Sequence, residues 1–154
     1  SYHYIIEPNG KVIKALDPNA HAARHGGTND SNAKAIGISL VNTYDHATPG
    51  PKKLFGGATY TVPEKSAWHK STRTADAGKL YEPFPAKQVD AMIGLIKSLK
   101  NNKRPDSKTS NIKHITGHEN IKGGKGDPGP AFDPYWDKVI SQTGLTVHPS
   151  YGIK

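Results

Sequence analysis

The densest group of polar residues that could carry out chemistry lies in the glycine-rich stretch 117–130, GHENIKGGKGDPGP. His118 stands where a short apolar run ends, and Asp127 follows after glycines that let the chain fold back. An imidazole and a carboxylate brought together in this way are good ligands for zinc. The ordinary alternative is a surface histidine and an aspartate that caps a turn. Spacing alone leaves both interpretations open.

Two further charged residues, Lys125 and Glu119, lie close to this pair in the sequence. Lys125, two residues before Asp127, would place a cation over the same spot, or else stay a solvated charge as most lysines do. Glu119 is expected to point outward at the end of a strand. The chain has no cysteine, which excludes disulfides, thiol nucleophiles and cysteine-ligated metals, so any metal depends on the eight histidines and the carboxylates.

The chain has 154 residues, of which 34% are hydrophobic, and this is typical of a single domain. Lys and Arg number 21 against 13 Asp and Glu, and the net charge of +8 favours a polyanionic neighbour such as nucleic acid, anionic lipid or a bacterial wall polymer. The lysines are dispersed, which argues against a nucleic-acid-binding module. No apolar run reaches the roughly 18 residues of a membrane span and no signal peptide is visible, so we expect a soluble chain, acting as a monomer.

The first elements are predicted from apolar patterns and turn residues. The runs 2–6 and 11–15 flank the turn pair at 9–10 and predict a hairpin. Residues 17–34 have no helical or alternating period and predict a long loop. The mostly apolar run 35–42 is typical of a central strand covered on both faces.

The later part of the chain predicts two helices with a strand between them. Prolines and glycines punctuate residues 43–84, which we interpret as a surface insertion of loops. Residues 85–102 predict a helix with a core-facing stripe, and 112–117 a short strand. Asp133-Pro134 is typical of the N-cap and first position of a helix that ends near Gly144. The stripe consists of Val89, Met92, Ile93, Ile96 and Leu99. This order predicts a single α/β domain with a central mixed β-sheet flanked by helices.

Four segments in order also carry a family resemblance. GHENIKGGKGDPGPAFD closely resembles the GH…K-x-DPGP-x-FD signature of the zinc-dependent N-acetylmuramoyl-L-alanine amidases. This is the type 2 amidase family, which includes phage amidase-type lysozymes and is related to peptidoglycan recognition proteins. SYHYIIEPNGKVIK resembles the family's hairpin, ARHGGTNDSNAKAIGISLVN its following strand, and YEPFPAKQVDAMIGLIKSL the proline-led helix of the periplasmic branch. The resemblance extends from Tyr2 to about Val139.

The resemblance implies a role for six residues and one cofactor. His118 and Asp127 would be ligands of Zn²⁺, and Tyr2 and Lys125 would assist the reaction from either side of the metal. His25 and Asn32 would bind the substrate, peptidoglycan or its muramoyl peptides. The bond cleaved in the family joins the lactyl group of N-acetylmuramic acid to L-alanine of the stem peptide.

The chain departs from the family pattern at two positions. The family's first zinc ligand lies on a strand upstream of the hairpin, and no stretch of this chain matches it, so the domain 1–154 is expected to lack that strand. Within this chain, His25 is the candidate for a third zinc ligand. His3 is not, because neighbouring side chains of a strand point to opposite faces, so His3 points away from the metal if Tyr2 faces it. The second departure is Ser39, which stands where some members carry a glutamate base.

Two functions therefore remain open at this point. The first is an active zinc amidase of the bacterial cell wall or periplasm, secreted or delivered by a phage. The second is a catalytically impaired peptidoglycan-binding protein on the same scaffold. In either case the groove is expected at the carboxyl end of the 35–42 strand, walled by the loop 17–34 and the insertion 43–84.

Overall fold

The computed structural model describes residues 1–43, 48–54, 57–102, 111–121 and 123–151. Its strands are β1 (Tyr4–Ile6), β2 (Val12–Lys14), β3 (Ile38–Leu40), β4 (Gly50–Lys53), β5 (Thr59–Val62), β6 (His69–Lys70), β7 (Leu80–Tyr81), β8 (His114–Ile115) and β9 (Thr146–Val147). Its helices are α1 (Asn29–Lys34), α2 (Ala86–Lys100), α3 (His118–Ile121) and α4 (Trp136–Thr143), with 3₁₀ turns η1 (Lys65–Ala67), η2 (Thr74–Asp76) and η4 (Pro130–Tyr135).

The main sheet has three strands in the order β2-β1-β3 and is mixed, as the sequence predicts. Tyr4 of β1 lies opposite Lys14 in antiparallel β2 and opposite Ile38 in parallel β3. The run 35–42 was expected to be central, and this is wrong for the described sheet, in which β1 is central and β3 is at the edge. Ile38 and Leu40 pack against the core yet also line a groove, which explains their apolar character.

The predicted hairpin is confirmed, with a wider turn than two residues. The Glu7 N–H donates to the Lys11 carbonyl at 3.0 Å, and the Gly10 N–H donates to the Glu7 carbonyl at 2.8 Å. Gly10 has a φ of +88°, a conformation that side chains disfavour. A Cβ there would also lie only 3.0 Å from the Lys87 carbonyl oxygen of α2, so the turn fits directly under the start of the long helix.

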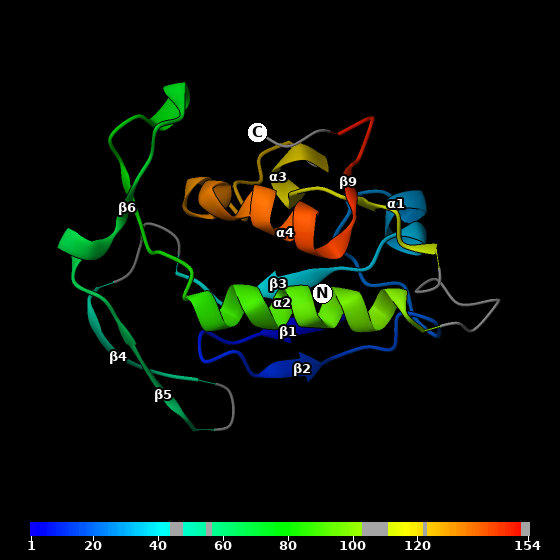
Figure 1. Ribbon diagram of the computed structural model, residues 1–154, viewed down its shortest axis with the longest axis horizontal. Helices are drawn as coiled ribbons and strands as arrows, with labels where there is room; N and C mark the ends of the chain where they lie inside the picture. The colour runs from blue at the N-terminus through cyan, green and yellow to red at the C-terminus, as the bar shows by residue number, and fades with distance from the viewer. Residues whose placement is uncertain (44–47, 55–56, 103–110, 122, 152–154) are drawn as a thin grey trace.

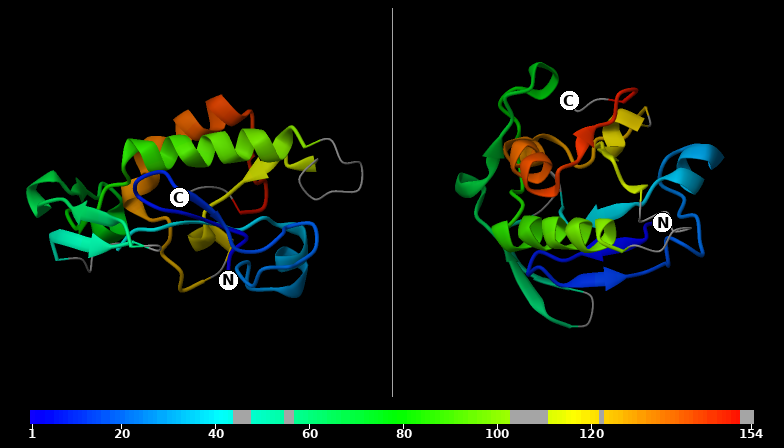
Figure 2. Two further views of the ribbon diagram at one scale, coloured as in Figure 1. Left: turned by 90° about the horizontal axis from the view of Figure 1, so that it is seen from below. Right: turned by 45° about the vertical axis from the view of Figure 1, so that its right-hand side comes forward.

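Helix α2 supplies the centre of the core, and its predicted apolar stripe is buried at all five positions. It lies beside α4 on one side of the main sheet (Figures 1 and 2). Phe132, Trp136 and Val139 complete this core from η4 and α4. Buried Gln88 ties the helix to the sheet, because its Nε2 donates to the carbonyls of Ile6 at 2.8 Å and Val41 at 2.9 Å.

Two local expectations are corrected by the structure. The loop 17–34 contains the helix α1, which has no buried residue to reveal it but begins with a capping box between Thr28 and Ser31. The insertion 43–84 is more than loops, since it forms the hairpin β4–β5 and the pair β6–β7 beside the core (Figure 1). Its positions 44–47 and 55–56 lie outside the described residues.

The last helix ends as predicted and begins differently. Gly144 caps α4 in the left-handed conformation, with a φ of +65°. Asp133 does not act as its N-cap, because a 3₁₀ turn precedes Trp136 and the Asp133 carboxylate binds Arg73 instead. Among the described residues, no helix has both the length and the hydrophobicity to cross a bilayer.

Candidate active site

Four of the six residues singled out by the sequence line a large groove of about 800 Å³. One wall comes from β3 and another from β8, and the deep part is formed by apolar side chains of α2, such as Met92 and Ile96. The polar end is formed by Tyr2, His25, His118 and Asp127. Ser39 lines the same groove. The groove therefore joins an apolar floor to a group of titratable side chains, which is typical of a ligand site.

The structure brings His118 and Asp127 together. The Nδ1 atom of His118 lies 2.9 and 3.1 Å from the two carboxylate oxygens of Asp127. The loop between them is closed by its backbone, because the Glu119 N–H donates to the Asp127 carbonyl at 2.8 Å. His118 opens α3 directly after the β8 strand, and Asp127 ends the glycine-rich loop. The loop thus folds back and brings His118 into contact with Asp127, which their spacing in the sequence permitted but did not require.

The donor atoms of this pair suit zinc in their chemistry. Two ligands of one tetrahedral zinc, each about 2.0–2.2 Å from the metal, lie about 3.3–3.5 Å apart, somewhat farther than the 2.9 and 3.1 Å between the His118 Nδ1 atom and the Asp127 oxygens, which contact each other directly. The second ring nitrogen of His118, Nε2, is buried without a hydrogen-bond partner among the described residues. The described residues contain no group of three or more histidine and carboxylate ligands. The His118–Asp127 pair is the candidate ligand set in the described part of the chain, and His25 does not join it in such a group.

His25 is held against the groove by its backbone and by ring contacts. The Asn32 Oδ1 atom accepts hydrogen bonds from the backbone N–H groups of His25 at 2.9 Å and Gly26 at 2.7 Å. The ring stacks on Tyr2, with centroids 6.4 Å apart, and packs so closely on Gly37 that a Cβ there would lie 2.8 Å from the ring. Asn32 does not itself line the groove in the described structure, so the contacts shown for it position His25.

The electrostatic surroundings keep the His25 ring neutral. Burial, together with the charges of the nearby His3 and His118 rings, lowers its pKa to about 4, although a contact with the Ala23 backbone acts in the opposite direction. Neither ring nitrogen has a hydrogen-bond partner of good geometry in the described part of the chain. A neutral, unsatisfied imidazole in a groove wall is ready to accept or donate a hydrogen bond to a ligand.

His3 is fully buried and differs from His25 in that both ring nitrogens are satisfied. Its Nδ1 accepts a hydrogen bond from the Gly37 N–H at 2.9 Å, so its Nε2 carries the proton that it shares with the His21 carbonyl at 3.1 Å. The ring packs edge-on against His25 at 5.5 Å. His3 therefore supports the wall of the groove from behind, in keeping with its predicted orientation away from the metal side.

Tyr2 and Lys125 occupy different environments. Burial, reinforced by the charge of Asp127, raises the pKa of the Tyr2 phenol, which therefore remains a hydrogen-bond donor at neutral pH. Lys125 is exposed and does not line the groove in the described structure.

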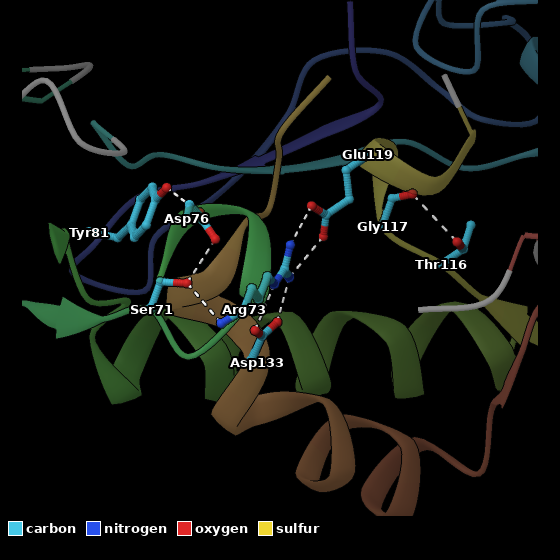
Figure 3. A network of polar contacts seen from close by, with 8 residues as sticks. All are labelled: Ser71, Arg73, Asp76, Tyr81, Thr116, Gly117, Glu119 and Asp133. Atoms are coloured by element: carbon cyan, nitrogen blue, oxygen red, sulfur yellow. Dashed lines mark hydrogen bonds and ion pairs between the residues drawn. The ribbon is translucent and has the colours of Figure 1, made fainter. Parts of the chain in front are cut away.

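Sequence reasoning missed the environment of Glu119. Its side chain was expected to point outward, and this is wrong, because Glu119 is only 6% exposed and pairs with Arg73. Figure 3 shows the Arg73 guanidinium between the carboxylates of Glu119 and Asp133. Arg73 lies 46 residues before Glu119 and 60 before Asp133. No local spacing signal connects residues so far apart, so only the folded structure could reveal this contact.

The fold and this groove together define a small α/β domain with a histidine–aspartate pair suited to a metal. The family model of N-acetylmuramoyl-L-alanine amidase matches residues 1–130. The chain therefore belongs to this amidase family, whose members act on the peptidoglycan of the cell wall. No curated protein and no solved structure matches the chain.

Proposed function

We propose that this chain hydrolyses the amide bond between N-acetylmuramic acid and L-alanine in peptidoglycan, with zinc held by His118 and Asp127. The observation that carries the proposal is the contact of the His118 Nδ1 atom with the Asp127 carboxylate at 2.9 Å in the polar end of the groove. Membership of the amidase family supplies the class of bond and substrate.

The side chains around this pair have distinct tasks in the proposed reaction. Zinc, when bound, supplies a water of lowered pKa and polarises the scissile carbonyl. The protonated phenol of Tyr2 donates a hydrogen bond to the carbonyl oxygen as negative charge develops on it. The Lys125 ammonium donates from the other side once its side chain turns inward. His25, stacked on Tyr2, orients the phenol and contacts the substrate.

The rest of the groove suits a long substrate with apolar and polar parts. Its floor accommodates methyl and lactyl groups, and its rim is formed by polar residues such as Ser31 and Lys34 from α1. The net charge of +8 favours association with anionic wall polymers. We therefore place its action at the bacterial cell wall or in the periplasm, reached by secretion or with a phage.

A comparison of two lysine variants tests the catalytic proposal. Lys125→Ala should lower kcat on a purified muramoyl peptide by about 10²–10³-fold with little change in KM, because the ammonium acts mainly in the transition state. Lys97→Ala is the matched control, since Lys97 is exposed on α2 and does not line the groove. Loss of less than about threefold in Lys125→Ala, against that expected loss, would leave Lys125 as a solvated charge and refute its role.

A second candidate function is favoured by one observation. No group of three histidine or carboxylate side chains suited to a metal occurs among the described residues, whereas catalytic zinc sites generally use three ligands from the protein. The alternative is therefore a peptidoglycan-binding protein on the same scaffold without hydrolytic activity. Retention on purified sacculi without release of soluble muramoyl peptides, in the presence of added zinc, would support this alternative and contradict the amidase proposal.

A further inference from the structure

Arg73 makes four hydrogen bonds that join two distant carboxylates. Its Nε and Nη2 atoms donate to Asp133 at 2.8 and 2.5 Å, and its Nη1 and Nη2 atoms donate to Glu119 at 2.7 and 3.1 Å (Figure 3). The side chains of Arg73 and Glu119 are only 17% and 3% exposed. Paired, desolvated contacts of this kind are the strong form of an arginine–carboxylate interaction.

The Arg73 backbone is itself held in place by a second set of contacts. Its N–H donates to the Ser71 hydroxyl at 3.2 Å, and that hydroxyl donates to Asp76 at 3.0 Å. The Tyr81 hydroxyl donates to the other Asp76 oxygen, and this contact lowers the pKa of Asp76. These contacts hold the backbone of the segment 71–79, which connects β6 to β7 and carries Arg73.

Glu119 connects this arginine to the candidate active site. Its side chain binds Arg73, and its backbone N–H donates to the Asp127 carbonyl at 2.8 Å. It directly follows His118, whose ring contacts the Asp127 carboxylate. One residue therefore joins the segment that carries His118 to the segment that carries Asp127, and Arg73 fixes that residue from behind.

We propose that Arg73 is a positioning residue that sets the separation of His118 and Asp127 by holding Glu119 and Asp133. This inference rests on the proposed function, in which those two side chains bind zinc. It assigns a task to the segment 43–84, which the sequence presents only as a surface insertion. Arg73, which lies in that segment, contacts the chain on both sides of Asp127, at Glu119 and at Asp133.

The geometry explains why arginine is required. A lysine ammonium has a comparable charge but cannot form two parallel pairs of N–H···O bonds with two carboxylates at once. Arg73→Lys should therefore keep the charge balance and lose the fixed orientation. Partners that orient metal ligands from behind typically change metal affinity by 10- to 100-fold when they are removed.

Zinc affinity, measured at a temperature where every variant is folded, provides the first test. Arg73→Lys should raise the Kd for Zn²⁺ at least about tenfold. Val139→Ala is the matched control, since Val139 is fully buried in α4 and its loss destabilises the fold without touching the groove. A Kd for Arg73→Lys within about threefold of the wild-type value, well below that expected change, would overturn the inference.

Amide hydrogen exchange in the metal-free protein provides a second test that does not depend on zinc. In Arg73→Lys the Glu119 amide should exchange about tenfold faster relative to the Ile93 amide of α2, because the loop opens locally. Val139→Ala should accelerate both amides together, as general destabilisation does. Equal acceleration of both amides in Arg73→Lys would reject the positioning role. Absence of zinc binding by the wild-type protein would instead reject the proposed function, while the exchange result still decides the role of Arg73.

Discussion

Two clusters of charged and polar side chains include residues of the segment 117–133, one around Arg73 and one at the polar end of the groove, and they differ in how completely their atoms are paired. Around Arg73, four hydrogen bonds join one guanidinium to two carboxylates. At the polar end of the groove, the Nε2 atom of His118 and both ring nitrogens of His25 have no hydrogen-bond partner among the described residues. The first cluster is saturated and the second is not.

This difference indicates which cluster holds the structure and which one holds a ligand. Folded proteins pair nearly all of their buried polar atoms, so atoms left without partners require an explanation. Under the proposed function, a metal ion at the His118–Asp127 pair and a substrate beside it would supply contacts in the groove. The saturated cluster needs no such ligand, and its effect should be on stability and on the position of its neighbours.

The largest predicted effect comes from breaking the saturated cluster. Arg73→Met should destabilise the protein by about 3–5 kcal/mol, because the Glu119 carboxylate would remain buried without its partner. Urea unfolding of the metal-free protein measures this loss. Adding Glu119→Gln to Arg73→Met should restore part of the stability by removing the unpaired charge. Equal stability of the single and double variants would show that burying the unpaired Glu119 charge costs no free energy, and would contradict the assigned role of this cluster.

A smaller effect is expected at Asn32, which positions the unsaturated cluster. Asn32→Ala removes the acceptor for the His25 and Gly26 backbone N–H groups and should cost about 1–3 kcal/mol. Asn32→Asp keeps the acceptor and should retain most of the stability. The unfolding free energies of both variants check the difference. If the two variants lose the same free energy, the hydrogen bonds to Asn32 do not hold the His25 loop.

A further effect, reduced by the partial exposure of His25, should appear as a dependence of stability on pH. The His25 pKa is lowered to about 4 in the folded protein, against the ordinary value of 6.5, so the unfolded chain takes up a proton first as the pH falls. The full stability is present above about pH 6.5, which is the ordinary pKa of a histidine side chain. It is lost progressively as the pH falls toward the folded-state pKa of about 4. The melting temperature of metal-free protein between pH 7.5 and 4 measures it, and His25→Phe should show a shallower decline. Identical declines would assign the pH dependence to other groups.

The sequence predicted those parts of the fold that depend on local pattern. The hairpin followed from its turn residues, and α2 followed from an apolar stripe that is buried at every position. The helix α1 escaped detection because its residues are polar and unburied, so that only its capping box marks it. The strand β3 was expected to be central because apolar residues that line a groove resemble those covered by a second layer.

The candidate site likewise has one contact that the sequence predicted and one that it did not. The separation of His118 from Asp127 along a glycine-rich loop allowed their contact to be anticipated, and the structure brings the two side chains together. The pairing of Glu119 with Arg73 depends on a fold that joins positions 46 residues apart, and no pattern of adjacent residues indicates it. Lys125 is exposed and outside the groove lining, so its assignment still rests on the resemblance and on its own test.

The central claim is that the unsaturated cluster is a zinc site formed by His118 and Asp127. The most direct measurement is metal analysis and zinc titration of the wild-type protein beside His118→Ala, with circular dichroism to show that both are folded. We predict one zinc per wild-type chain and a loss of affinity of at least about 100-fold in His118→Ala, since a ligand and not only its support is removed. Zinc bound with unchanged stoichiometry and affinity in His118→Ala would contradict the claim.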